Sequence, residues 1–232
     1  ADTRARAMQY PKRIRAVSLD YQLMRARVQL TYEETPGVAA KRFRAMLDEN
    51  PGLDAARYGL VLAQMKTGQL DEAGKTLAPL LSKAPDDIVY NLAQIELDMA
   101  ANRLDAADRR QARMRTLYPS NYPLQQSGID LLLKQQRIPD AERALDDLLK
   151  TRSKDPDVWY QVAEVRGLSG NTIGLHQARA EFFALVGDYN QAIEQLDYAK
   201  RRASNNFQLA SRIDARQREL SEEKRLVEQM LR

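Results

Sequence analysis

The stretch that decides the fold is residues 51–85, PGLDAARYGLVLAQMKTGQLDEAGKTLAPLLSKAP, which begins and ends on prolines 34 residues apart. The same interval recurs along the chain in three series of positions. They are Pro51, Pro85 and Pro119; Ala39, Ala73, Ala107 and Ala141; and Pro36, Leu70, Leu104 and Ile138. Because several series share one period, the chain is predicted to be an array of 34-residue repeats.

Each repeat carries the signals of two helices. Apolar residues recur at intervals of three and four, as in Leu77, Leu80 and Leu81. Gly68 stands where the first helix of a pair must turn, and the equivalent positions hold Asn102, Gln136 and Gly170. No segment alternates as a strand would. This is the pattern of the tetratricopeptide repeat, so the predicted fold is all-α, a solenoid of about twelve helices in antiparallel pairs.

The repeat is predicted to be less regular toward its C-terminal end. Ser153 stands where a fourth proline would fall, and Gly187 follows Gly170 by only 17 residues, so we expect an irregular join near residues 153–175. From about residue 205 the pattern predicts one long helix that caps the solenoid. The predicted domains are a linker or tail of a preceding domain over 1–15 and the solenoid over 16–232.

Composition excludes most catalytic chemistry within this chain. Its 232 residues include no cysteine and a single histidine, His176, so no Cys/His metal cluster and no Cys–His pair can form. A Ser-His-Asp triad could run only through His176. No apolar run approaches the roughly 18 residues of a membrane span, so no membrane insertion is expected. We therefore expect a binding protein with no enzyme activity, cofactor or metal of its own.

Particular residues extend the likeness beyond the generic repeat. The stretch from Tyr58 to Pro85, with His176 to Glu181 and Gly187 to Ala192, resembles the C-terminal repeat domain of the β-barrel assembly-enhancing proteases. The opening residues, Ala1 to Ala7, are similar to the end of that family's protease domain.

The resemblance implies a periplasmic zinc metalloendopeptidase whose H-E-x-x-H domain, with its zinc, lies N-terminal to residue 1. It also implies protein partners for the repeat domain: the outer-membrane barrel assembly machinery, client barrel proteins and the protease domain itself. None of the family's catalytic residues maps onto this chain.

The concave face of the solenoid is the predicted binding surface, because it is lined by the first helix of each pair. Counting back from the four turn positions gives its rows. Six residues before the turns stand Leu62, Glu96, Asp130 and Glu164; ten before stand Tyr58, Leu92, Gln126 and Tyr160; three before stand Met65, Met99, Leu133 and Gly167. These rows predict an acidic groove beside tyrosines and methionines that accepts an apolar segment with polar or basic features. The alternative is that the carboxylates are merely solvated helix positions.

Other functions remain as alternatives. A generic tetratricopeptide scaffold would show the same repeat with another protein partner. A nucleic-acid-binding helical repeat, suggested by the sequence pI of about 9.2, needs a basic inner face with stacking aromatics, where this sequence places an acidic row. An enzyme built on Asp146 and Asp147 is disfavoured because adjacent helical residues point to different faces. We interpret His176 and Trp159 as packing residues, the alternatives being a pH-sensitive contact and a partner anchor.

Overall fold

The computed structural model describes residues 18–32 and 35–230, and within these ranges it contains twelve helices and no strand. The predicted all-α fold and the predicted number of helices are therefore confirmed. The predicted linker over 1–15 lies outside the described residues. The helices divide between Pro119 and Ser120 into two compact units, here called unit 1 and unit 2.

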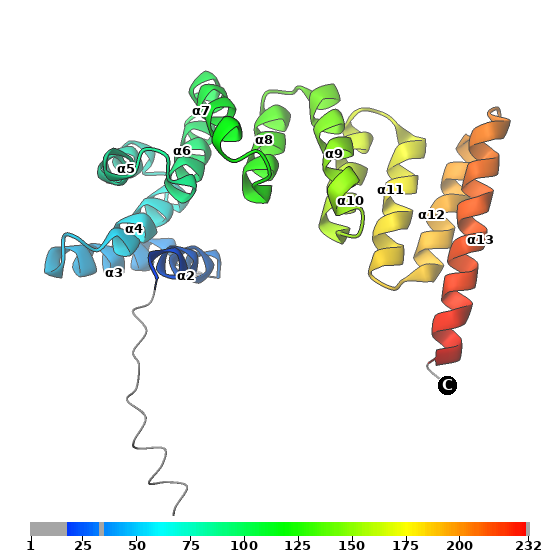
Figure 1. Cartoon of the computed structure of the whole chain (residues 1–232), viewed down its shortest axis with the longest axis horizontal. Coiled ribbons are helices and arrows are strands. Elements are labelled where there is room, and N and C mark those ends of the chain that lie inside the picture. The colour runs from blue at the N-terminus through cyan, green and yellow to red at the C-terminus, as the bar shows by residue number, and fades with distance from the viewer. Residues whose placement is uncertain (1–17, 33–34, 231–232) are drawn as a thin grey trace, which may run out of the picture. The chain divides into compact units, whose positions relative to one another are not determined.

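Of the helices that the structure describes, unit 1 holds α2 to α7 (Figure 1). They are α2 (Leu19–Thr31), α3 (Pro36–Glu49), α4 (Asp54–Lys66), α5 (Leu70–Lys83), α6 (Ile88–Ala100) and α7 (Leu104–Leu117). Its core is shared by α2 to α6. The helices approach closely at Gly59, where a Cβ atom would lie 2.5 Å from the ring of Phe43. A side chain at Gly59 would therefore push α3 and α4 apart.

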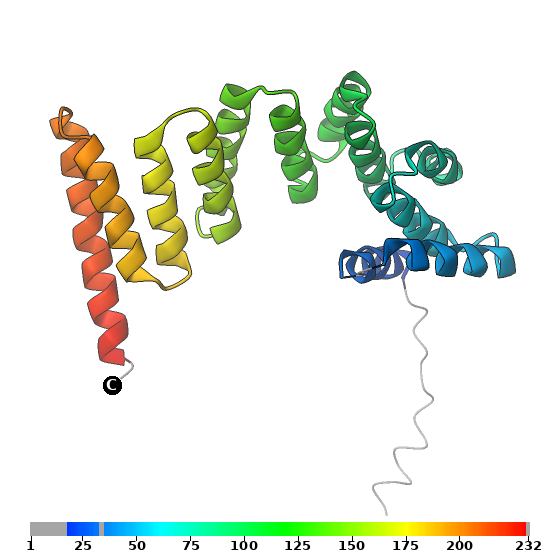
Figure 2. The same cartoon turned by 180° about the vertical axis from the view of Figure 1, so that it is seen from behind.

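Unit 2 holds six helices that stand side by side in chain order, as both views show (Figure 1 and Figure 2). They are α8 (Tyr122–Lys134), α9 (Ile138–Arg152), α10 (Pro156–Leu168), α11 (Thr172–Leu185), α12 (Tyr189–Arg202) and α13 (Phe207–Met230). One core cluster joins α8 to α11 and another joins α11 to α13.

The 34-residue period of the sequence reappears in the positions of the helices. The first helices α4, α6, α8 and α10 begin at residues 54, 88, 122 and 156, and the second helices α3, α5, α7, α9 and α11 begin at 36, 70, 104, 138 and 172. The alanine series is buried throughout, since Ala39, Ala73, Ala107 and Ala141 are each fully shielded from solvent. Small side chains at this position let the two helices of each pair pack closely.

The predicted turn positions adopt the left-handed backbone conformation. Gly68 and Gly170 each have φ +76°, while Asn102 and Gln136 have φ +57° and +59°. Only glycine adopts this conformation without steric cost, so the turns at Asn102 and Gln136 are strained relative to the other two.

The departure from strict repetition that we predicted near residues 153–175 is small at that place. Helix α9 is one residue longer than α7, and the link before α10 has three residues instead of four. A clearer change follows between α11 and α12, where Gly187 has φ +85°. The earlier left-handed turns lie within a helix pair, whereas this one links one repeat to the next.

The long C-terminal helix is confirmed as α13. Ile213 and Leu220 of α13 are buried, whereas Val227 and Met230 are exposed. The C-terminal part of α13 extends past the end of α12 (Figure 1). Two hydrogen bonds of 2.8 Å from the Arg216 guanidinium to the Glu181 carboxylate tie α13 to α11.

His176 and Trp159 both pack within unit 2. His176 Nδ1 lies 2.9 Å from Oε1 of the buried Gln195, and its ring packs against Tyr198. Trp159 donates its indole N–H to the Ser153 carbonyl at 2.8 Å and packs against the first core cluster.

Candidate functional site

The predicted surface residues of unit 1 are mostly covered. Tyr58 is completely buried and Leu62 nearly so, and both belong to the core of the unit. Met65, Leu92 and Met99 are half-buried. Tyr58 and Leu62 are therefore packing residues in this structure, and a partner could not reach them without rearranging unit 1.

Glu96, the acidic member of the row in unit 1, is held by an arginine from another helix. The Arg27 guanidinium of α2 donates two hydrogen bonds to the Glu96 carboxylate, at 3.0 and 3.1 Å. Its Nε donates a third to the Tyr58 hydroxyl at 3.0 Å. Burial works against the charge of Arg27, but Glu96 and Tyr58 outweigh it and hold the Arg27 pKa above its ordinary value. The network joins α2, α4 and α6.

The acidic residues of unit 2 instead border an open pocket of about 480 Å³. Its lining is Ile129, Asp130, Leu133, Gln161, Glu164, Val165, Gly167, Leu168 and Arg179. Four of these residues come from the predicted rows: Asp130, Glu164, Leu133 and Gly167. The structure therefore brings together two predicted site residues, Asp130 and Glu164, with Leu133 and Gly167 from the row three residues before the turns.

The pocket, here called the unit 2 pocket, combines apolar walls with charges. Leu168, which lines the pocket, is 67% exposed. Glu164 is exposed and makes no hydrogen bond or ion pair with any described residue. Such a site can take an apolar side chain and offer a carboxylate to a neighbouring basic group.

The other two predicted residues of unit 2 lie outside this lining. Tyr160 is 52% exposed, with its ring 5.7 Å from that of Phe182. Gln126 is half-buried and donates to the Tyr122 hydroxyl at 2.6 Å.

Two residues that line the unit 2 pocket, Leu168 and Arg179, are absent from the three rows predicted from the sequence. Leu168 stands two residues before a turn, where the other repeats have Lys66, Ala100 and Lys134. A leucine at a position that is otherwise lysine or alanine is a feature of the sequence from which an exposed apolar contact could have been predicted. Arg179 belongs to a second helix, α11, and a reading restricted to first helices could not find it.

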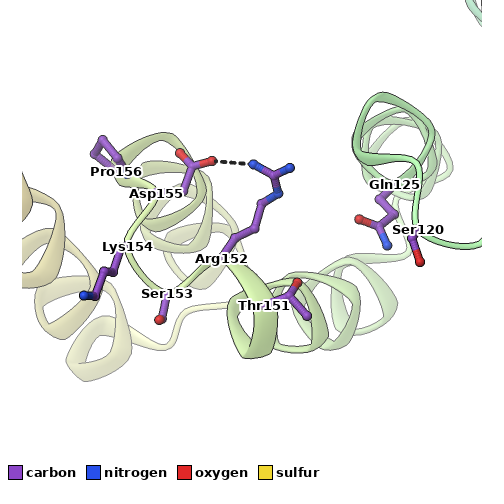
Figure 3. Close-up of a pocket in the computed structure, with 8 residues that line it drawn as sticks. All are labelled: Ser120, Gln125, Thr151, Arg152, Ser153, Lys154, Asp155 and Pro156. Carbon is purple, nitrogen blue, oxygen red and sulfur yellow. Dashed lines mark hydrogen bonds and ion pairs between the residues drawn. The ribbon is translucent and has the colours of Figure 1, made fainter.

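A larger hollow of about 750 Å³ lies near the ends of α9 and α10 and contains none of the predicted residues (Figure 3). Its lining is mainly polar, and Arg152 points toward Asp155, which also caps α10. The same guanidinium lies 3.8 Å from the centre of the Tyr122 ring. Arg152 and Asp155 therefore stabilise the local structure where α9 meets α10.

The described ranges offer no cluster of three or more His, Cys, Asp or Glu side chains that could hold a metal ion. The zinc implied by the family resemblance does not fit the residues present here. In the same part of the chain, no helix combines the length and the apolar character needed to cross a membrane.

Comparison with known proteins supports the class of fold. The tetratricopeptide-repeat family model matches residues 30–95. A tetratricopeptide repeat protein from Parabacteroides merdae has a similar structure, with a TM-score of 0.54 and 10% identity over 88% of this chain and 86% of that one. The chain thus has the fold of the tetratricopeptide-repeat proteins, a series of antiparallel helix pairs.

More specific relatives confirm the resemblance drawn from the sequence. The chain is 29% identical over 220 residues to the putative beta-barrel assembly-enhancing protease of Vibrio cholerae, covering 93% of this chain and 45% of that protein. It is 30% identical over 162 residues to the beta-barrel assembly-enhancing protease of Escherichia coli K12, covering 70% and 33%. The chain spans less than half the length of these curated relatives.

Proposed function

We propose that this chain is the protein-binding part of a periplasmic metalloprotease that acts in the assembly and quality control of outer-membrane β-barrel proteins. Its partners would be the barrel assembly machinery, client barrel proteins and its own protease domain. Support comes from the names of the relatives and from the repeat fold, which elsewhere serves protein recognition. Zinc binding and peptide hydrolysis are assigned, as the resemblance implies, to a domain N-terminal to residue 1.

The observation that carries the binding role is the unit 2 pocket. An apolar side chain from a partner would contact Leu133 and Leu168, and burying it is the main source of favourable energy. A basic group beside it would meet Glu164. An exposed carboxylate contributes on the order of 0 to 1 kcal/mol, so Glu164 would orient the segment more than hold it.

Photocrosslinking tests this proposal. A photoreactive amino acid is placed at Tyr160, Glu164 or Leu168, and the purified chain is mixed with detergent-solubilised barrel assembly complex from the same bacterium. Arg143, an exposed residue on the second helix α9 of the same unit, provides the matched control position. We expect crosslinks from the three positions on the α10 side and none above background from Arg143.

Equal labelling from Arg143 would contradict a role for the pocket. Selective crosslinks to a different envelope protein would keep the pocket and replace the partner, which is the generic scaffold alternative. Glu164→Lys should reduce the crosslink yield from Tyr160 severalfold if a basic group of the partner lies beside the carboxylate.

A further inference from the structure

The surface of α7 carries a hollow lined mainly by arginine side chains. Its volume is about 280 Å³, and its lining is Asp98, Ala106, Arg109, Arg110 and Arg113. A second hollow adjoins it and shares Ala106 and Arg109. Both lie in unit 1 and share no residue with the unit 2 pocket. What they bind is therefore independent of the function proposed above.

The neighbouring repeats show how a cation at this place is normally neutralised. Positions equivalent to Arg109 hold Lys75 in α5 and Arg143 in α9. Each pairs with a carboxylate three residues earlier on its own helix. Lys75 lies 2.9 Å from Glu72, and Arg143 pairs with Asp140.

In α7 this internal partner is missing. The residue three positions before Arg109 is Ala106, which has no carboxylate and leaves the space that the two hollows share. Arg109 makes no hydrogen bond or ion pair with any described residue. A guanidinium without a partner, beside an open hollow, is available to an anion from outside the chain.

Arg110 provides a second, independent indication. It donates through Nη1 to Asn91 Oδ1 at 2.8 Å, but its Nε is buried and finds no acceptor within the described part of the chain. Burial lowers the pKa of Arg110, Asp98 opposes this, and the nearby charge of Arg113 adds to it. Arg110 and Arg113 both line the hollow, so an oxyanion bound there would offset the repulsion between their two guanidinium groups.

The local charge favours a carboxylate over a phosphate. The charged residues that line or pair across the two hollows are Arg103, Arg109, Arg110, Arg113, Asp86, Asp98 and Asp105. Four positive and three negative charges leave a surplus of one, which suits a single carboxylate, whereas the aspartates would repel a doubly charged phosphate or an anionic lipid surface. We propose that this hollow, the α7 arginine site, binds a carboxylate presented by an acidic segment of a protein partner.

The test uses the full chain and a fluorescein-labelled tetraglutamate peptide, with binding followed by fluorescence anisotropy at low salt. A tetraglutamine peptide serves as the uncharged control. Ala106→Glu restores the carboxylate found in α5 and α9 and removes no arginine. We expect it to weaken tetraglutamate binding about fivefold, and Arg109→Ala to act similarly, because each removes one charge-assisted contact.

Lys75→Ala and Arg143→Ala are matched controls, because they remove cations from equivalent positions that are already paired. We expect each to weaken binding less than about twofold. Equal losses in all four variants would overturn the proposal, since they would indicate general attraction to a basic chain. Failure of the tetraglutamate peptide to bind would overturn it too.

Two further probes separate the sources of an anion. Tighter binding of inorganic phosphate, or of phosphatidylglycerol vesicles, than of tetraglutamate, with loss in Arg109→Ala, would overturn the choice of a carboxylate partner. Circular dichroism of each variant checks folding, and if Ala106→Glu does not fold, Arg109→Ala with its two controls decides the outcome.

Discussion

Glu96 in unit 1 and Glu164 in unit 2 occupy the same position of the repeat, six residues before the turn, yet their surroundings differ. Arg27 holds Glu96 in a bidentate ion pair, whereas Glu164 has no partner among the described residues and borders a pocket. The difference originates in one other position. Those equivalent to Arg27 hold Val61, Ile95 and Ile129, which cannot pair with a carboxylate. A single arginine therefore makes Glu96 a structural member of the row.

The largest difference in stability between the two units is expected at the tyrosines ten residues before the turns. Tyr58 is fully buried and Tyr160 is 52% exposed. We expect Tyr58→Ala to lower the free energy of unfolding by about 3–5 kcal/mol, because it leaves a cavity, and Tyr160→Ala to lower it by about 1 kcal/mol or less. Urea unfolding followed by circular dichroism measures both, and similar losses would remove the distinction between the two units.

Alkaline pH should also distinguish the units. Burial raises the pKa of Tyr90 in unit 1 to about 12, against 10.0 ordinarily, while the equivalent position in unit 2 is Leu124. Between pH 10 and 12 the unfolded chain loses the Tyr90 proton and the folded chain keeps it, so stability falls as pH rises. The loss from this group is about 2–3 kcal/mol at pH 12.

Tyr90→Phe checks that origin of the alkaline loss. The buried Tyr90 hydroxyl has no hydrogen-bond partner in the described structure, so the variant should fold at pH 8 with equal or slightly greater stability. Its unfolding free energy should then decline less between pH 10 and 12. If the unfolding free energy of Tyr90→Phe falls between pH 10 and 12 as much as that of the unaltered chain, a group other than Tyr90 causes the alkaline loss.

Removing the carboxylate charges compares the two acidic positions directly. Glu96→Gln breaks the bidentate pair with Arg27, and because both side chains are about one-third exposed we expect a loss of only about 1–2 kcal/mol. Glu164→Gln should change stability by less than about 0.5 kcal/mol. Chemical denaturation at pH 7 provides the measurement, and a larger loss at Glu164 would mean that its carboxylate has a structural partner.

A small difference in stability is also expected at the turns. Gln136 of unit 2 has φ +59°, where Gly68 of unit 1 has φ +76°. Gln136→Gly should raise the free energy of unfolding by up to about 1 kcal/mol, and Gly68→Ala should lower it by a similar amount. Thermal melts of both variants test the sign, and a destabilised Gln136→Gly would show that the glutamine side chain contributes more than the strain costs.

The sequence by itself determined the repeat architecture. The 34-residue spacing predicted the helix pairs, the turn positions Gly68, Asn102, Gln136 and Gly170 all have positive φ, and the alanine series is fully buried. These features depend on local backbone preferences and on a contact that every repeat makes in the same way, so they can be read from periodicity.

Only the tertiary structure decided which members of the inner rows are accessible. Tyr58 and Tyr160 are equivalent in the sequence pattern, and only their packing distinguishes the buried one from the exposed one. Arg27 reaches Glu96 across 69 positions of sequence, and Arg179 reaches the pocket from a second helix. Side-chain exposure depends on what neighbouring helices supply, and periodicity within one repeat does not contain that information.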